Sequence, residues 1–179
     1  MRKIIAFFLK KRGWEIVIKT KIPKKCILCV APHTSNWDFV IAISLYKLVG
    51  GDPHFLMKKD WFFFPLKYLL YSLGGIPVNR GKKNSLTQQM VELIGKEDDF
   101  QLAIAPEGTR KQNSQWKTGF YHIALAANIP ITLAYLDYGK KEIGVEKIFY
   151  PTGDAEKDIE EIKDYYKHVQ PKHPDKFSL

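Results

Sequence analysis

The sequence CILCVAPHTSNWD, residues 26–38, joins a short apolar run to a polar loop and the start of a helix. Residues 26–31 are all apolar, which is typical of a strand that is buried on both faces of a parallel sheet. Ser35 is a favoured N-cap residue, and Asp38 adds a carboxylate to the first turn of a helix predicted over 37–48. A buried strand that leads directly into a capped helix is the unit from which layered α/β folds are built.

The rest of the chain continues this alternation of strands and helices. Further strands are predicted at 14–20, 54–57, 76–78, 101–105, 129–135 and 143–149, and further helices at 4–9, 61–73, 85–95, 119–127 and 155–168. The pattern predicts an α/β fold with a mostly parallel central sheet flanked by helices, preceded by a short amphipathic N-terminal helix. With 179 residues and 45% hydrophobic side chains, the chain suits a single layered domain with one core.

The formal net charge of +9 favours polyanionic partners. An anionic membrane surface, an acidic carrier protein and nucleic acid all meet this condition, and composition does not choose among them. The aromatic residues lie in apolar runs and are not interleaved with a basic stripe, and no common recognition motif for nucleic acid occurs. A nucleic-acid partner is therefore not expected and stands as a distant alternative that rests on charge alone.

The amino terminus and the two cysteines indicate in which compartment the protein is expected. Only six apolar residues, 4–9, precede a basic cluster, which is too short a run for a signal peptide or a spanning helix. This helix either lies in a lipid interface or packs on the core, since both uses share its pattern. Cys26 and Cys29 fall on opposite faces of one strand, which argues against a shared metal or redox site. We expect two core thiols in a reducing compartment, and neither export nor membrane crossing.

Three loops that follow predicted strands carry the candidate site. Ligands of open α/β sheets gather beyond the carboxyl ends of the strands, which here lead into 32–38, 79–83 and 106–111. The Asp38 carboxylate can hold one ring nitrogen of His33 and leave the other free to act as a general base. Helix capping alone also explains Asp38, so the pair by itself is a weak signal.

The other two loops contain the groups suited to an anionic acceptor. Arg80 and Arg110 have the planar donor geometry that binds phosphate by two hydrogen bonds. Pro106 and Gly108 are explained by a simple turn, which leaves Glu107 between them without a structural reason. A carboxylate that orients a hydroxyl-bearing acceptor is an explanation for Glu107.

The order of these motifs resembles a known enzyme family. Histidine, four residues and aspartate at 33–38, then GIPVNR at 75–80 and PEGTR at 106–110, are similar to the glycerolipid acyltransferases, which include lysophosphatidic acid acyltransferase (1-acyl-sn-glycerol-3-phosphate acyltransferase). The resemblance covers residues 33–135, and the combined motifs are far more specific than the histidine–aspartate spacing alone. One departure is Leu133, at a position where the family usually has a second proline in its fourth motif, and this leaves the acyl-donor contacts of that region open.

The resemblance implies a reaction and a set of residues. A fatty acyl group would pass from a thioester to the hydroxyl of a lysophospholipid, with 1-acyl-glycerol-3-phosphate giving phosphatidic acid. His33 would remove the proton of the acceptor hydroxyl while Asp38 holds the tautomer of His33. The residues implied in substrate binding are Arg80, Glu107, Gly108, Thr109 and Arg110. Another lipid hydroxyl, such as that of a lyso-ornithine lipid, is the alternative acceptor.

The same resemblance sets the expected co-substrate. Acyl-CoA or an acylated acyl carrier protein would supply the acyl group, and no bound cofactor or metal is expected. The chain contains no G-x-S-x-G stretch, so we expect direct transfer without an acyl-enzyme.

The residue pattern at the two ends, together with the resemblance between them, suggests a division of the chain. We predict an N-terminal amphipathic helix and strand over 1–25 as a membrane-interface element, an acyltransferase domain over 26–170 and a loose C-terminal tail over 171–179. The protein would then be peripheral, on the cytoplasmic face of a membrane. The aromatic segment 61–73 either meets lipid or the acyl chain, or is a core helix.

Overall fold

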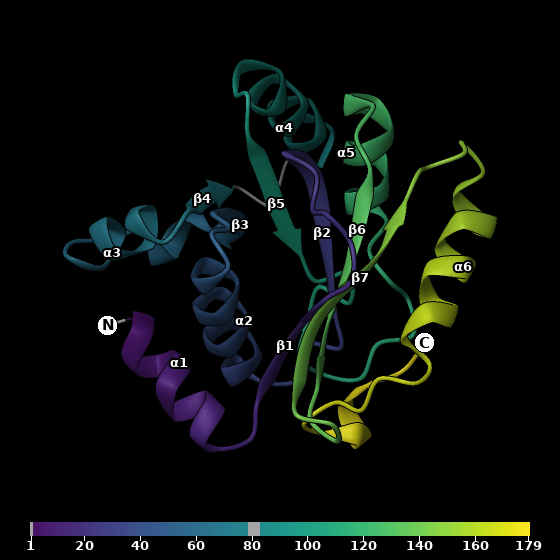
Figure 1. The fold of residues 1–179 in the computed structure, drawn as a ribbon. Coiled ribbons are helices and arrows are strands. Elements are labelled where there is room, and N and C mark those ends of the chain that lie inside the picture. Colours follow the sequence, from purple (N-terminus) through teal and green to yellow (C-terminus); the bar gives the residue numbers. More distant parts are fainter. Residues whose placement is uncertain (1, 79–82) are drawn as a thin grey trace.

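A seven-stranded sheet forms the centre of the computed structural model, which describes residues 2–78 and 83–179 (Figure 1). The strand order is β1-β7-β6-β2-β5-β3-β4. Neighbouring strands are parallel except for β6 and β7. The bounds are β1 Glu15–Ile18, β2 Lys25–Ala31, β3 Pro53–Lys58, β4 Gly75–Val78, β5 Phe100–Ile104, β6 Ile131–Asp137 and β7 Glu142–Phe149. The predicted α/β class with a mostly parallel sheet is confirmed.

Helices cover both faces of this sheet. Their bounds are α1 Arg2–Lys11, α2 Asn36–Leu48, α3 Leu66–Ser72, α4 Lys83–Lys96, α5 Gly119–Ala127 and α6 Ala155–Tyr166. The helices α4, α5 and α6 contribute to the larger core on one face of the sheet, whereas α1 and α2 pack on the other face (Figure 1). The two faces are both apolar along β2, which explains why its residues form an uninterrupted apolar run.

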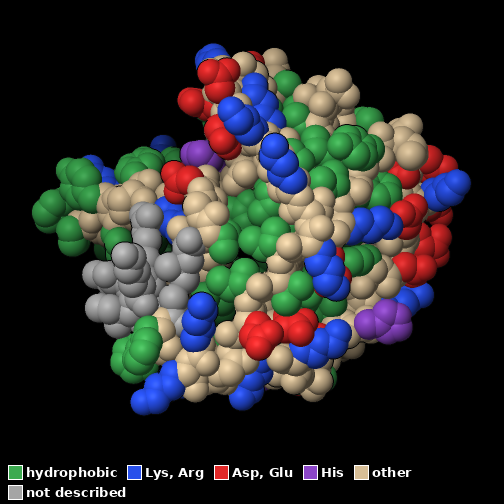
Figure 2. All heavy atoms as spheres, viewed as in Figure 1, with side chains coloured by type: hydrophobic (Ala, Val, Ile, Leu, Met, Phe, Trp, Pro, Cys, Tyr) green, Lys and Arg blue, Asp and Glu red, His purple; other side chains and the backbone are tan. Residues whose placement is uncertain are grey.

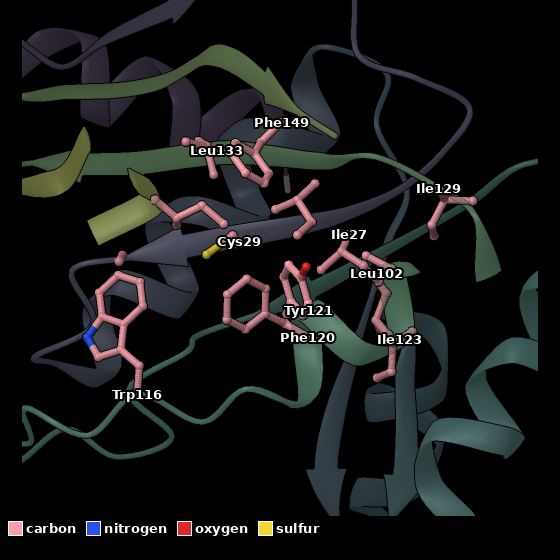
Figure 3. Close-up of a cluster of buried hydrophobic side chains, with 14 of the residues drawn as sticks. Ile27, Cys29, Leu102, Trp116, Phe120, Tyr121, Ile123, Ile129, Leu133 and Phe149 are labelled. Carbon is pink, nitrogen blue, oxygen red and sulfur yellow. The ribbon is translucent and has the colours of Figure 1, made fainter. Parts of the chain in front are cut away.

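The larger core lies between β2 and the helix α5 (Figure 3). Ile27 and Cys29 of β2 meet the fully buried Phe120 and Tyr121 of α5. Each such side chain contributes about 1.5–3 kcal/mol through removal of its apolar surface from water. Cys26 packs in a different cluster on the opposite face, so the two thiols face away from each other as predicted.

The antiparallel pair β6 and β7 follows from a tight connection. Parallel neighbours need a crossover, but only residues 138–141 join these two strands. The side chain of Asp137 stabilises the turn, because its Oδ1 accepts hydrogen bonds from the amides of Gly139 (2.9 Å) and Lys140 (3.0 Å). The turn therefore begins at the carboxyl end of β6.

The predicted helix over 61–73 is divided in the structure. A single 3₁₀ turn spans Lys59–Trp61, and α3 begins only at Leu66. Pro65 is the N-cap residue of α3, a place where its missing N–H leaves no helical hydrogen bond unmade. The segment is not a core helix, since only Leu70 of α3 is buried.

The carboxyl terminus differs from its predicted form, whereas the predicted amino-terminal helix is present as α1. Residues 171–179 were expected to be loose, but Phe177 and Leu179 pack against the larger core and the His173 amide donates to Thr34 Oγ1 at 3.3 Å. Near the amino terminus, Leu9 is buried against α2 while Phe7 and Phe8 are exposed. The helix α1 thus packs on the core with one side and presents aromatic rings to the outside with another. No helix in the described ranges is both long and apolar enough to span a bilayer.

Candidate active site

The candidate site lies where three neighbouring strands end. β5, β2 and β6 are adjacent and parallel, so the loops that follow them emerge at the same edge of the sheet. His33 follows β2, Glu107 follows β5 and Tyr138 follows β6. The fold therefore brings together side chains that are up to 105 positions apart in the sequence, from His33 to Tyr138.

The Asp38 carboxylate is the centre of a dense set of hydrogen bonds. Its Oδ2 accepts the amides of Thr34 and Ser35, each at 2.7 Å, and its Oδ1 accepts the Tyr138 hydroxyl at 2.7 Å. Ser35 returns a capping bond by accepting the Trp37 amide at 3.0 Å. Asp38 is only 3% exposed, so these donors replace water almost completely.

His33 contacts the same carboxylate. Its Nδ1 lies 3.5 Å from Asp38 Oδ2, and its side chain is 21% exposed. The sequence offered two roles for Asp38, capping of the helix or orientation of His33. In the structure the Asp38 side chain has both roles. The contact is long for a hydrogen bond, which is common in active sites without substrate. With Nδ1 turned toward Asp38, Nε2 is the nitrogen available to take up a proton.

The hydrogen bonds keep Asp38 ionised despite its burial. Burial by itself raises the pKa of this carboxyl, but hydrogen bonds from His33, Tyr138, Ser35 and Thr34 outweigh it and lower the pKa below the ordinary value of 3.8. A negatively charged Asp38 is what stabilises a histidine that has accepted a proton.

Glu107 has a partner that the sequence did not indicate. Its two carboxylate oxygens both accept the backbone amide of His33, at 3.1 and 3.0 Å, and the residue is 4% exposed. Burial raises the pKa of Glu107 from 4.5 to about 7; the amide and the charge of His33 lower it, and the charge of Asp38 raises it. This geometry gives Glu107 a role in holding the backbone of His33, beside the acceptor contact predicted from its motif.

The loop that carries Glu107 also presents the predicted phosphate-binding arginine. Gly108 has a φ of +66°, a conformation that L side chains rarely adopt, and Asn113 Nδ2 donates to the Glu107 carbonyl at 3.0 Å. Thr109 accepts the Lys111 amide at 3.2 Å, which turns the chain after the glycine. Arg110 is exposed, and its side chain makes no hydrogen bond or ion pair with any other residue that the structure describes. Arg80, the other predicted arginine, lies outside the described residues.

Sequence analysis did not identify Tyr138. It has no motif of its own and lies just beyond the strand predicted at 129–135. One signal was available, because residues at the carboxyl end of a parallel strand belong to the edge where ligands bind. The strand ends two residues later than predicted, at Asp137, which puts Tyr138 at that edge.

Neither cysteine is positioned to act as a nucleophile. Cys26 and Cys29 are both 0% exposed, and burial raises the pKa values of their thiols to about 11 and about 12. Reactive cysteines have accessible sulfurs and lowered pKa values. The described residues also contain no group of three or more His, Cys, Asp or Glu side chains arranged to hold a metal ion.

Comparison with known proteins identifies the family. The family model described as Acyltransferase matches residues 14–135. The chain is 29% identical over 139 residues to the probable 1-acyl-sn-glycerol-3-phosphate acyltransferase of Mycoplasma pneumoniae, covering 72% of this chain and 52% of that protein. It is 28% identical over 165 residues to the 1-acyl-sn-glycerol-3-phosphate acyltransferase of Limnanthes douglasii (82% and 57%) and 26% identical over 125 residues to that of Escherichia coli K12 (66% and 50%).

The matched region contains all three motifs of the candidate site. Because it runs from the start of β1 into β6 and includes His33, Arg80 and Glu107, the chain belongs to the acyltransferase family. The resemblance to the glycerolipid acyltransferases seen in the motifs is confirmed by the relatives. The chain spans about half the length of the curated relatives it matches.

Proposed function

We propose that the protein transfers a fatty acyl group from a thioester to the hydroxyl of a lysophospholipid, with 1-acyl-glycerol-3-phosphate as acceptor and phosphatidic acid as product. The observation that carries this proposal is the contact of His33 with a buried, ionised Asp38 inside the region matched by the acyltransferase family. The names of the three relatives support the choice of acceptor.

In the proposed reaction, His33 is the general base. Its Nε2 accepts the proton of the acceptor hydroxyl as the hydroxyl oxygen attacks the thioester carbonyl carbon. A carbon–oxygen bond forms, the tetrahedral intermediate collapses, and the carbon–sulfur bond breaks. The leaving thiolate takes the proton back from His33, which restores the neutral imidazole. Asp38 stabilises the protonated imidazole between these two steps.

The surroundings of His33 support direct transfer without an acyl-enzyme. Both thiols are buried away from it, and the Ser35 hydroxyl is occupied as the N-cap of α2. A covalent route needs a nucleophile within hydrogen-bonding distance of the base. No side-chain hydroxyl or thiol is bonded to the ring of His33 in the described part of the chain.

The acceptor and the donor are tested together. Purified protein would be offered 1-acyl-glycerol-3-phosphate, a lyso-ornithine lipid and a phosphate-free monoacylglycerol, each with acyl-CoA and with acylated acyl carrier protein, and the products identified by mass spectrometry. The proposal expects phosphatidic acid as the main product. Preferential acylation of the lyso-ornithine lipid would replace the proposed acceptor.

Substitution of Arg110 tests the phosphate contact within the same assay. Because the exposed guanidinium is free to bind a phosphate, Arg110→Gln is expected to lower kcat/KM for 1-acyl-glycerol-3-phosphate about tenfold or more, through loss of a charge-assisted hydrogen bond. Lys111→Gln is the matched control, since it removes one positive charge from the same exposed loop. An equal loss in both variants, or an equal loss with monoacylglycerol, would contradict a specific contact between Arg110 and phosphate.

We also propose that the protein attaches peripherally to an anionic membrane surface through the segment around α3. Six large apolar or aromatic side chains there are 54–75% exposed; we call them the α3 patch: Trp61, Phe63, Phe64, Tyr68, Leu69 and Tyr71. Figure 2 shows hydrophobic side chains gathered at the left edge of the molecule, over the segment labelled α3 in Figure 1. Lys58 and Lys59 precede the patch and Lys67 lies within it, and aromatic rings beside lysines are the composition of a lipid interface.

The position of the α3 patch suits a lipid acceptor. The segment leaves the carboxyl end of β3, which runs parallel to β5, the strand that leads to Glu107. A membrane at the α3 patch would meet the same edge of the sheet from which the candidate site emerges. The Lys67 ammonium lies 5.1 Å from the centre of the Tyr68 ring, so charge and aromatic surface are presented together.

Co-sedimentation with vesicles of phosphatidylglycerol and phosphatidylcholine tests this surface. The double variant Trp61→Ser/Phe64→Ser is expected to bind at least about tenfold more weakly, since each ring contributes about 1.5–3 kcal/mol when its apolar surface leaves water. Tyr150→Ser is the control, because Tyr150 is an aromatic residue outside the α3 patch that is 69% exposed. Unchanged vesicle binding by the double variant would exclude the α3 patch as the attachment surface.

A further inference from the structure

Tyr138 lies at the far side of the Asp38 carboxylate from His33. Its hydroxyl donates to Asp38 Oδ1 at 2.7 Å, whereas His33 and the amides of Thr34 and Ser35 all face Oδ2. The two oxygens therefore have separate sets of partners. Tyr138 lies outside the region matched by the family model, which ends at residue 135.

Several contacts hold Tyr138 in this position. The Asp137 side chain stabilises the turn at residues 138–141, which begins with Tyr138. The Tyr138 amide donates to the Gln170 carbonyl at 2.8 Å. The rings of Tyr138 and Trp14 pack edge to face, with their centroids 5.1 Å apart and an angle of 88° between the ring planes. Trp14 is itself 9% exposed, so the ring of Tyr138 rests on a packed surface.

We infer that Tyr138 is a positioning residue for acyl transfer: its hydroxyl holds the Asp38 carboxylate in the one rotation that directs Oδ2 to His33. The inference rests on the proposed role of His33 and Asp38. Rotation of the carboxylate would take Oδ1 away from its only donor among the described residues and leave that oxygen buried without a partner, which is unfavourable. A carboxylate held in place keeps the His33 ring in one orientation and one tautomer.

The hydroxyl of Tyr138 also affects the charge that His33 meets. Burial first, and then the hydrogen bond to Asp38, raises the pKa of Tyr138 far above its ordinary value of 10, so the phenol stays a donor at all relevant pH. The titratable groups around the carboxylate are His33, Tyr138 and, from the loop after β5, Glu107. Loss of the Tyr138 donor removes one of the hydrogen bonds that lower the pKa of Asp38, so this carboxyl would become more basic.

Tyr138→Phe tests the inference, because it keeps the ring against Trp14 and removes only the hydroxyl. The expected result is a fall in kcat of about tenfold with KM values within about twofold of wild type. A purely structural role would lower the melting temperature without lowering the kcat of the folded protein.

Two further variants make the result decisive. Tyr135→Phe is the matched control, since it removes a β6 tyrosine hydroxyl that is bonded to Glu146 at 3.1 Å and to Glu142 at 3.4 Å and not to the site; its kcat and KM values should stay unchanged. In an Asp38→Ala background, Tyr138→Phe should cause no additional loss of kcat, because the hydroxyl acts through Asp38. Wild-type kcat in Tyr138→Phe would overturn this inference alone, whereas full activity of Asp38→Ala would overturn the proposed function as well.

Discussion

Purified His33→Ala protein is expected to fold like the wild type and to transfer acyl groups about 10³-fold more slowly, the loss typical of a missing general base. The fold should survive because the His33 side chain is partly exposed and makes a polar contact with Asp38 alone among the described residues. The backbone amide that Glu107 holds is present in alanine too. The measurement is kcat under saturating donor and acceptor, beside a circular dichroism spectrum and a thermal melt.

The controls separate chemistry from folding. His122→Ala, on the exposed side of α5, should keep wild-type activity. Asp38→Ala should lose transfer to an extent similar to His33→Ala. It should also unfold more easily, by about 1–3 kcal/mol, because the Thr34 and Ser35 amides lose their buried acceptor. Comparable turnover by purified His33→Ala and wild type would rule out the proposed mechanism.

The stability of the protein is expected to fall as pH rises from about 4.5 to about 7, and Glu107 is the residue responsible. Its pKa is raised from 4.5 to about 7 by burial, so the folded protein holds this proton more tightly than the unfolded chain. A raised pKa contributes stability that is complete below 4.5 and is lost as pH rises through about 7. For a residue that is 4% exposed, this shift corresponds to about 3 kcal/mol.

Urea unfolding of Glu107→Gln at a series of pH values checks this expectation. A neutral amide cannot ionise, so the difference in the free energy of unfolding between variant and wild type should change by about 3 kcal/mol from pH 4.5 to 8, in favour of the variant at high pH. Glu160→Gln on α6, which removes an exposed carboxyl, should follow the wild type. If the difference in the free energy of unfolding between Glu107→Gln and wild type did not change with pH, the pKa of Glu107 would not be raised in the folded protein.

Much of the local structure could be predicted from the pattern of apolar residues. The helix predicted over 119–127 has those bounds in the structure, and the buried strand predicted at 26–31 begins only one residue earlier. The segment 61–73 was predicted less well, because its aromatic residues have helical spacing while Pro65 prevents a continuous helix. The α3 patch has the composition of a core helix although its side chains are exposed. Composition did not decide this, because exposure depends on which other elements pack against a segment.

The candidate site was only partly visible in the sequence. The capping pattern and the His33–Asp38 contact are local, since the partners are three and five positions apart in the sequence, and their geometry follows from a helix that starts at the end of a strand. The motifs identified Glu107 as a site residue but not its partner. Its bonds to the His33 amide join residues 74 positions apart, and no spacing rule predicts them.

The sequence by itself determined the α/β class, the capped helix after His33 and the family of the protein, because these depend on periodicity, on neighbouring residues and on motif order. Only the tertiary structure decided that β5, β2 and β6 are neighbours, and hence that Glu107 holds the His33 backbone and that Tyr138 reaches Asp38 across 100 positions. Strand order follows from how all the elements together bury both faces of the sheet, a property of the whole chain that no short stretch contains.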